Sequence, residues 1–222
     1  MIDYRKLRLK NITSAEFKHT LLLFYWPVYL FAFFFIERSI ILEYKPVESF
    51  LDAKIPFCEF FIIPYFFWYF FLAGISVYTL LFDIKAFKKF MGFIIITFSV
   101  ASILFVLFPN MQNLRPTEFP RDNFLTDTVK FLYTIDTNTN VCPSLHVAGS
   151  LGVVFASWNS KGLNKFLPRL IISIIAILII LATVFLKQHS VIDVFAGIIL
   201  SFIVLPLVFI LPQRLKKLKK SV

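Results

Sequence analysis

Six long apolar runs constrain this chain more than any other feature of its sequence. A membrane-spanning helix needs about 20 consecutive, mainly apolar residues, and most of the runs reach that length. The chain is 59% hydrophobic with a mean hydropathy of +0.80, more than one soluble core of this size can bury. We therefore predict an all-α polytopic membrane protein with six transmembrane helices. The runs are Leu21–Ile41, Phe60–Phe82, Phe90–Phe108, Leu145–Trp158, Leu170–Leu186 and Val191–Leu211.

The fourth run differs from the other five because it is short and rich in polar and small residues. It contains His146 and two serines, and Gly149 and Gly152 would allow close packing against neighbouring helices. Such a helix is predicted to lie inside the bundle. No polar stretch is long enough for a soluble domain, so residues 1–222 are predicted to form a single membrane domain.

The distribution of Lys and Arg predicts the orientation of the helices. Sixteen of the 23 lie in alternate segments: the N-terminus, the loop after the second run, the loop after the fourth, and the tail. The positive-inside rule then places both termini in the cytoplasm. The same pattern explains the net charge of +10 without nucleic-acid binding. The basic start resembles a signal peptide, but no Ala-x-Ala cleavage site follows, so we expect a retained first helix.

Three polar segments converge at the outward face under this topology. Arg115 follows the third run, Cys142 to His146 opens the fourth, and Lys187 to Asp193 joins the fifth to the sixth. The hydrophilic stretch 109–143 is too long for a simple connection, which is typical of functional loops. Ionisable residues at a membrane boundary often mark functional sites, so catalytic elements are expected between residues 109 and 197.

These residue types fit phosphoryl chemistry without a metal. His189 and Asp193 are four residues apart, so on one helix face the carboxylate would fix the imidazole tautomer and leave its other nitrogen as a nucleophile. His146 is suited to protonating a leaving group. Arg115 and Lys187 are candidate phosphate-binding cations. Ser144 could bind phosphate, cap the fourth helix, or do both.

The motifs resemble those of the type-2 phosphatidic acid phosphatase superfamily. Arg115-Pro116 is similar to the end of its first motif, Pro143-Ser144-x-His146 to its second, and His189-x-x-x-Asp193 to its third. The upstream Pro-rich segment Ile55–Tyr65 and the Cys-Pro-Ser-Leu-His run resemble its inositolphosphotransferase-like and inositol phosphorylceramide synthase branch. The resemblance implies attack by His189 on phosphorus, with His146 as acid and then base.

The sequence also departs from the family pattern at two cationic positions. Phe108 stands at the first-motif Lys, and Ala182-Thr183 at the third-motif Ser-Arg. The resemblance implies a lipid phosphatase that hydrolyses a lipid phosphate or diphosphate at the extracytoplasmic face of a plasma or bacterial cytoplasmic membrane, without a cofactor. The missing cations favour the alternative, a head-group phosphotransferase that uses a phosphodiester.

Other interpretations stay open at this point. Cys142, His146, His189 and Asp193 could form a four-ligand metal site. Arg115 and Lys187 could be interfacial anchors, and Arg121 is expected to be a solvated loop charge. A transport or scaffold protein could keep a lipid-binding pocket without chemistry. For the enzyme, the expected partners are a lipid phosphate or phospholipid substrate and the membrane bilayer. The sequence specifies neither oligomeric state nor a bridge between Cys58 and Cys142.

Overall fold

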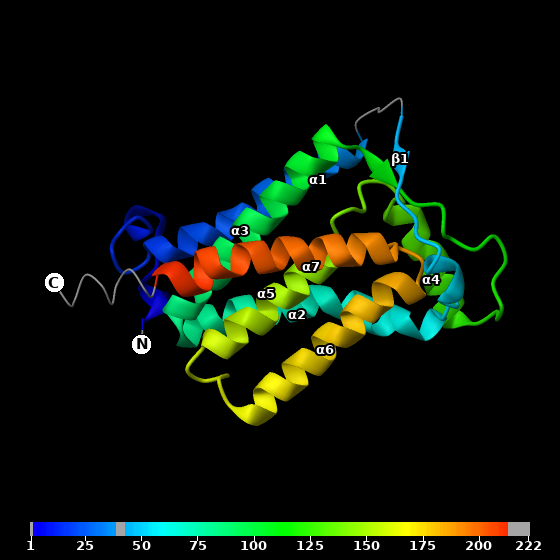
Figure 1. Cartoon of the computed structure of the whole chain (residues 1–222). Coiled ribbons are helices and arrows are strands. Elements are labelled where there is room, and N and C mark those ends of the chain that lie inside the picture. Colours follow the sequence, from blue (N-terminus) through cyan, green and yellow to red (C-terminus); the bar gives the residue numbers. More distant parts are fainter. Residues whose placement is uncertain (1, 39–42, 213–222) are drawn as a thin grey trace.

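The chain folds into a bundle of roughly aligned helices, as Figure 1 shows for the computed structural model. The structure describes residues 2–38 and 43–212, and it is 71% helical. The α-helices are α1 (Tyr25–Arg38), α2 (Ile62–Phe82), α3 (Ile84–Leu107), α4 (Phe124–Ile135), α5 (Leu145–Asn159), α6 (Phe166–Phe185) and α7 (Val191–Leu205). Short 3₁₀ turns precede α1 and α2, and a π-helical turn, Pro206–Ile210, continues α7.

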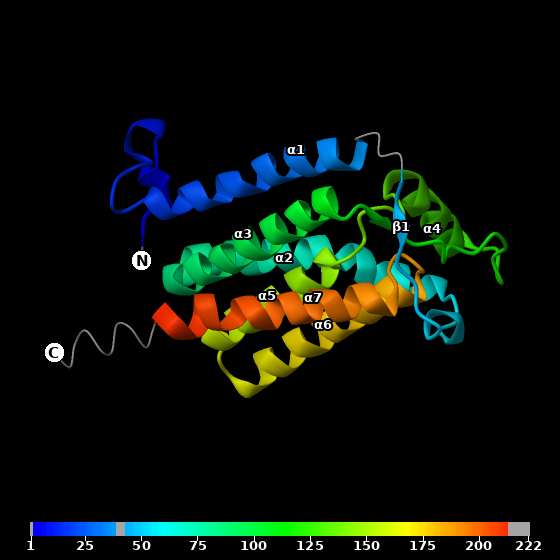
Figure 2. The same ribbon diagram turned by 45° about the horizontal axis from the view of Figure 1, so that its top comes forward.

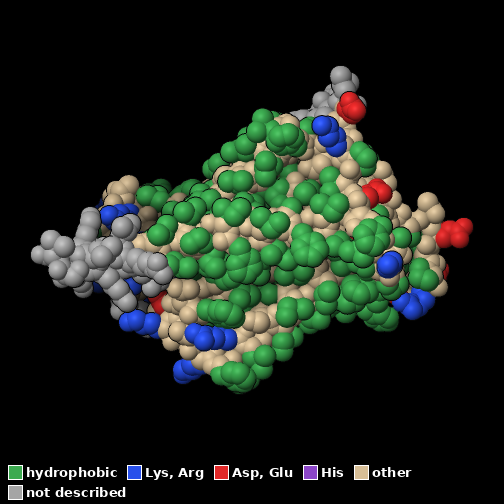
Figure 3. Space-filling view, viewed as in Figure 1, with side chains coloured by type: hydrophobic (Ala, Val, Ile, Leu, Met, Phe, Trp, Pro, Cys, Tyr) green, Lys and Arg blue, Asp and Glu red, His purple; other side chains and the backbone are tan. Residues whose placement is uncertain are grey.

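The two ends of the bundle differ in content. One end, here called the basic end, holds the N-terminal segment, the α2–α3 junction at Asp83 and the α5–α6 connection (Figure 1). The opposite end, here called the site end, holds the α1–α2 connection, α4 and the α6–α7 turn. In the face shown by Figure 3, hydrophobic side chains cover the middle while Lys and Arg lie towards the two ends. This distribution is typical of a protein that crosses a bilayer.

Five helices in the described ranges are long and apolar enough to cross a membrane. The sixth predicted span corresponds to α5, which has only 15 residues and is about 22 Å long at 1.5 Å per residue. That is shorter than the hydrocarbon core of about 30 Å. The predicted count of six is therefore not confirmed: the described residues hold five candidate spans and the shorter helix α5.

The position of α5 inside the bundle was predicted correctly. It packs against α2, α3, α6 and α7, and most of its side chains are buried. A Cβ added at Gly149 would lie 3.0 Å from the Trp68 indole, and one added at Gly152 would lie 2.9 Å from Phe93. These small residues let two large aromatic rings rest directly on the α5 backbone.

Several predicted boundaries shift. Helix α3 begins at Ile84 rather than Phe90, because the Asp83 side chain caps it by accepting from the Ala86 N–H at 3.1 Å. Lys85, Lys88 and Lys89 therefore lie on the helix and not in a loop. Residues 39–41 of the first predicted span, and the basic tail from Arg214 to Lys220, lie outside the described residues.

Helix α4 lies within the stretch that was expected to be a loop. Asn123 caps it by accepting from the Thr126 N–H at 3.0 Å, and the side chains of Val129 and Leu132 on one face of the helix are buried. Its opposite face carries exposed apolar side chains, including Phe124 and Phe131. Helix α4 lies at the site end of the bundle (Figure 1). One buried and one exposed face suit a helix that covers this end better than one that crosses the membrane.

Helix α1 lies on the outside of the bundle, where Figure 2 shows it along α3. The Tyr25 hydroxyl lies 3.1 Å from Ser99 Oγ, and the Tyr29 ring packs on Phe98 at 5.1 Å between centroids. Most other side chains of α1 are at least partly exposed, so this helix forms a separate wall beside the core.

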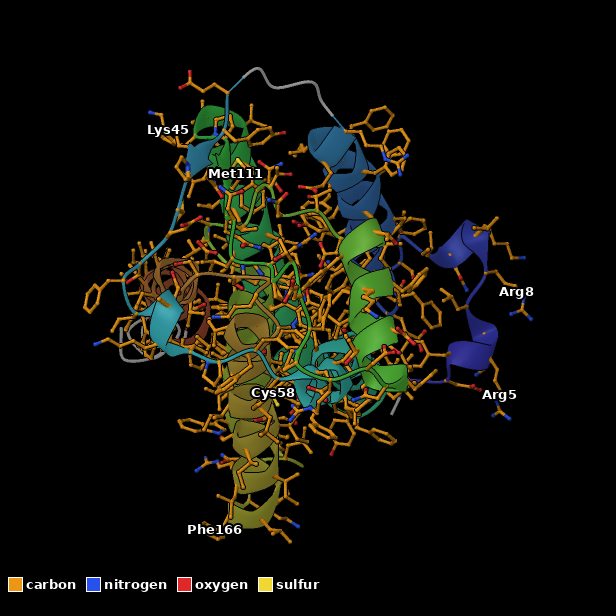
Figure 4. The ribbon with its side chains drawn as sticks, turned by 90° about the vertical axis from the view of Figure 1, so that its right-hand side faces the viewer. Arg5, Arg8, Lys45, Cys58, Met111 and Phe166 are labelled. Carbon is orange, nitrogen blue, oxygen red and sulfur yellow. The ribbon has the colours of Figure 1, made fainter. Side chains whose placement is uncertain are left out.

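A short parallel pairing closes the site end. Strand β1 (Lys45–Pro46) pairs with β2 (Asn110–Met111), and Lys45 and Met111 lie near each other in the end-on view of Figure 4. Asn110 is buried, and its Oδ1 accepts from the backbone N–H groups of Val141 and Cys142. The loop after α3 thereby fixes the segment that leads into α5.

Candidate active site

The α6–α7 turn holds His189 next to Asp193. Thr183 O accepts the N–H groups of both Gln188 and His189 at 3.0 Å, which folds the chain back beyond α6. Ser190 then caps α7 in a capping box with Asp193. The result is a distance of 3.4 Å between His189 Nδ1 and Asp193 Oδ2. His189 itself precedes the helix, so the predicted pairing is present although α7 starts two residues later than His189.

The start of α5 is joined directly to this turn. The Ser144 N–H donates to Asp193 O at 3.1 Å. A Cβ added at Gly197 would lie only 2.8 Å from Ser144 O, so α7 can approach α5 this closely only with glycine there. His146 follows in the first turn of α5, and its ring centroid lies 5.7 Å from that of His189.

Two aromatic rings of α2 hold the His146 imidazole. The ring centroids of Tyr65 and Trp68 lie 4.4 Å and 4.3 Å from that of His146. His146 is buried, and its Nε2 has no hydrogen-bond partner among the described residues. For the aromatic run Tyr65–Phe71 of α2, the sequence favours lipid-facing or interfacial packing over a lipid-tail groove. In the structure, two of its rings also pack against a candidate catalytic histidine.

Both histidines line one cavity of about 130 Å³. Its walls come from α1, α2, α3, the start of α5, the segment 136–141 and Gln188. Leu30 and Tyr69, which also line it, are more than half exposed on the outer surface. The cavity therefore reaches the side of the bundle between α1 and α2. It is smaller than typical ligand pockets of about 300–1,000 Å³, and would hold a head group rather than a whole lipid.

The polar lining of this cavity is mostly uncharged or acidic. Asp136 Oδ2 accepts from Tyr65 Oη at 2.7 Å and from Gln188 Nε2 at 3.1 Å. Asn140 and Thr137 also line it, and both donate to the Glu37 carboxylate. Among residues 2–38 and 43–212, neither Lys nor Arg contributes to the lining. Sequence reasoning missed Asp136, Asn140 and Gln188, because only the fold brings them beside the histidines.

Arg115 lies one side chain away from the cavity. Its Nη2 donates to Gln188 Oε1 at 2.7 Å and to Asp136 O at 2.6 Å, and its Nη1 donates to Tyr133 O at 3.0 Å. The guanidinium also lies 4.4 Å from the Tyr133 ring centroid. Burial lowers the pKa of Arg115, and Asp136 partly offsets this. Its predicted phosphate role stays a prediction, and its present contacts position Gln188.

Lys187 points away from the cavity. Its backbone φ is 53°, and its Nζ donates to Asp52 O at 2.7 Å and Ile55 O at 2.5 Å. Burial lowers the pKa of this ammonium group, with the Asp52 carboxylate acting in the opposite direction. These contacts favour a structural role for Lys187, which holds the 52–55 segment in place, over the predicted phosphate contact.

Ser144 shows the same preference for a structural role. It is fully buried as the N-cap of α5, and its Oγ accepts from the Val147 N–H at 3.5 Å. It does not line the cavity. Of the two alternatives left open by the sequence, the geometry favours capping.

Asp52 is a positioning residue that the sequence did not reveal. It is buried, its Oδ2 accepts from Ser190 Oγ at 2.7 Å, and its Oδ1 accepts from the Val191 N–H at 2.8 Å. This carboxylate stabilises the first turn of α7, where the helix dipole favours negative charge. No local pattern around Asp52 signals a contact that spans nearly 140 residues.

Arg121 and the two cysteines were also considered from the sequence. Arg121 is exposed, as expected for a solvated loop charge, and it also forms a two-pronged ion pair with the buried Glu59 carboxylate at 2.5 Å and 2.7 Å. Cys58 and Cys142 are free thiols. Burial and the neighbouring Asp193 carboxylate raise the pKa of the Cys142 thiol to about 12, which keeps it protonated.

The four residues of the alternative metal site do not form a ligand cluster. Within the part of the chain that the structure describes, no group of three or more His, Cys, Asp or Glu side chains is arranged to hold a metal ion. The arrangement of these side chains therefore gives no support to the four-ligand alternative.

A comparison with known protein families covers the site residues as well. The family model described as the PAP2 superfamily matches residues 91–217, which is more than half of the chain and includes His146, His189 and Asp193. The chain belongs to the PAP2 superfamily. No curated protein and no solved structure gives a significant match. Membership in the PAP2 superfamily confirms the resemblance seen in the motifs and supports a membrane enzyme of the phosphatase or phosphotransferase type.

Proposed function

We propose that this PAP2 protein hydrolyses a lipid phosphate or diphosphate through a phosphohistidine intermediate on His189. The observation that carries the proposal is the placement of His189 and His146 on one cavity, with Asp193 Oδ2 3.4 Å from His189 Nδ1. A carboxylate on one imidazole nitrogen leaves the other nitrogen, Nε2, available as a nucleophile.

The mechanism has two steps, formation and hydrolysis of the phosphohistidine. In the first, His189 Nε2 bonds to phosphorus, the bond from phosphorus to the leaving oxygen breaks, and His146 gives that oxygen a proton. Asp193 stabilises the positive charge that develops on His189. In the second, His146 takes a proton from water as the water oxygen bonds to phosphorus. The bond from phosphorus to Nε2 then breaks and phosphate leaves.

The surroundings support a lipid substrate that enters from the bilayer. The cavity reaches the apolar side of the bundle between α1 and α2, and Arg115 places a positive charge one side chain from it. The excess of Lys and Arg at the basic end supports an extracytoplasmic site end. The proposed location is a plasma or bacterial cytoplasmic membrane.

A detergent-micelle assay of wild type and His189→Gln tests this function. Lipid phosphomonoesters, diphosphates and phosphodiesters are offered with and without chelator, and free phosphate and new lipid are both measured. We expect phosphate release by the wild type, unaffected by chelator, and a loss of more than about a thousandfold in His189→Gln. An alkaline quench should trap phosphate on the peptide that contains His189.

His19→Gln is the matched control, because His19 is a buried histidine at the basic end that forms a hydrogen bond with the Tyr4 hydroxyl. The His19→Gln variant should keep its turnover. A well-folded His189→Gln protein that retains activity would refute the mechanism. If the wild type released no phosphate and formed no new lipid from any substrate, a lipid-binding or transport protein would be favoured instead.

A second candidate function is head-group transfer from a phosphodiester. The observation in its favour is that no Lys or Arg of the described chain lines the cavity, so a doubly charged phosphomonoester would be poorly neutralised there. Phe108 and Ala182-Thr183 stand where the family pattern has cations. In the same assay, transfer would yield a new head-grouped lipid without free phosphate.

A further inference from the structure

The seam between α3 and α7 contains two cavities that the proposed chemistry does not use. The two helices lie side by side along the bundle (Figures 1 and 2). One cavity lies at the basic end of the seam, and the other is an apolar groove closer to the site end. Neither of them shares a lining residue with the His189 cavity.

The cavity at the basic end is strongly cationic. It has a volume of about 730 Å³ and is lined by Lys85, Lys88 and Lys89 of α3 and by Lys161 of the α5–α6 connection. Its one acidic residue, Asp83, is already engaged, because its carboxylate accepts from the backbone N–H groups of Ala86 and Lys161. The charge of the cavity therefore calls for an anion, and the first turn of α3 adds the positive end of its dipole.

The groove above it is almost wholly apolar. It has a volume of about 740 Å³. Helix α3 contributes Ile96, Val100 and Leu104, and α7 with its continuation contributes residues from Ala196 to Leu207. These positions recur every three or four residues, so each helix presents one continuous face to the groove.

The cavity and the groove lie on the same face of α3. Lys89 and Ile96 are seven residues apart, which is two helical turns and about 10 Å along the axis. Gly92 lies between them, and a Cβ there would meet only Val208 Cγ1 at 3.8 Å. Val208 and Pro212 also line the basic cavity. A molecule with an anionic head and an apolar chain would match the charge at one end and the groove at the other.

We propose that the α3–α7 seam binds an anionic membrane phospholipid, with its phosphate among Lys85, Lys88, Lys89 and Lys161 and an acyl chain in the groove. Basic pockets between membrane helices are known to hold such head groups. The phosphate of the bound lipid lies at the opposite end from the histidines, so this lipid is a structural ligand and not a substrate. The proposal does not depend on the reaction at His189.

Lipid retention by full-length protein in detergent micelles tests this assignment. Native mass spectrometry and thermal shift are measured after addition of phosphatidylglycerol, phosphatidylcholine, glycerol phosphate or inorganic phosphate. The test variant is Lys85→Gln/Lys88→Gln/Lys161→Gln. The matched control is Lys10→Gln/Lys18→Gln/Lys165→Gln, which removes the same charge from exposed residues outside the cavity.

We expect phosphatidylglycerol to bind and raise the Tm of the wild type and the control. In the test variant its affinity should fall by about tenfold or more. Val100→Phe, which fills the groove without a change of charge, should also weaken retention, while Ile177→Phe on the exposed face of α6 should not. Equal binding by the test variant, equal loss in the control, or equal stabilisation by inorganic phosphate would overturn the proposal.

Discussion

The carboxylate of Asp193 serves two neighbours through one oxygen. Its Oδ2 accepts from the Ser190 N–H at 2.8 Å and faces His189 Nδ1 at 3.4 Å. The first contact is a helix cap, and in the proposed mechanism the second orients the nucleophile. Under that proposal a single residue links the stability of the α7 start to the chemistry.

Asp193→Asn should separate these two roles. An amide oxygen can still accept from the Ser190 N–H, and Asn caps helices about as well as Asp, so Tm should change little. The negative charge beside His189 is lost, and kcat should fall by about 10²- to 10⁴-fold. Asp127→Asn, an exposed residue of α4, makes the same chemical change outside the cavity and should leave kcat unaltered. Activity within twofold of wild type would show that Asp193 is only a cap.

The sequence predicted residues well where their partners are local. His189 and Asp193 meet because a four-residue spacing at a helix start fixes their separation. The direction of Lys187 was not predictable, because its ammonium group turns towards carbonyls of the 52–55 segment. A positively charged side chain beside a catalytic motif looks the same in sequence whether it faces substrate or backbone.

At the scale of elements, the contact between α5 and α7 determines how the two histidines meet. Gly197 is the point of closest approach, and the atoms opposite it are backbone and Cβ atoms that cannot rotate away. The site therefore depends on a residue that carries no functional group.

Gly197→Ala should push α7 from the start of α5 and destabilise the protein by about 1–3 kcal/mol, with turnover reduced as His189 moves from His146. Gly74→Ala in α2 is the matched control, because a Cβ there meets nothing within 4 Å. That change should be neutral or stabilise the helix by about 0.5–1 kcal/mol. Tm and turnover of both variants are the measurements, and equal effects would contradict the packing argument.

Long helices were predicted from apolar length, whereas α4 was missed. The capping residue Asn123 and the spacing of Val129 and Leu132 could have revealed it, but a short amphipathic helix is easily hidden in a polar stretch. Similarly, the start of α3 was placed too late because lysines were assigned to a loop. Charged residues in a first turn are compatible with helix, and only the cap at Asp83 shows where it begins.

For the whole molecule, the two ends of the bundle should face opposite sides of the membrane. Asp122→Cys lies at the exposed site end and Asn164→Cys in the α5–α6 connection at the basic end. In intact cells, a membrane-impermeant thiol reagent should label Asp122→Cys directly and Asn164→Cys only after permeabilisation. Unaltered protein measures the background from Cys58 and Cys142, and the reverse pattern would place the site in the cytoplasm.

The side opening of the cavity, between Leu30 and Tyr69, determines which substrate concentration controls the rate. A molecule that arrives through that opening travels in two dimensions and never crosses bulk water. Turnover would then depend on the mole fraction of substrate lipid in the surrounding membrane or micelle, so inert lipid would act as a diluent. Doubling the volume of the aqueous phase would leave the rate unchanged.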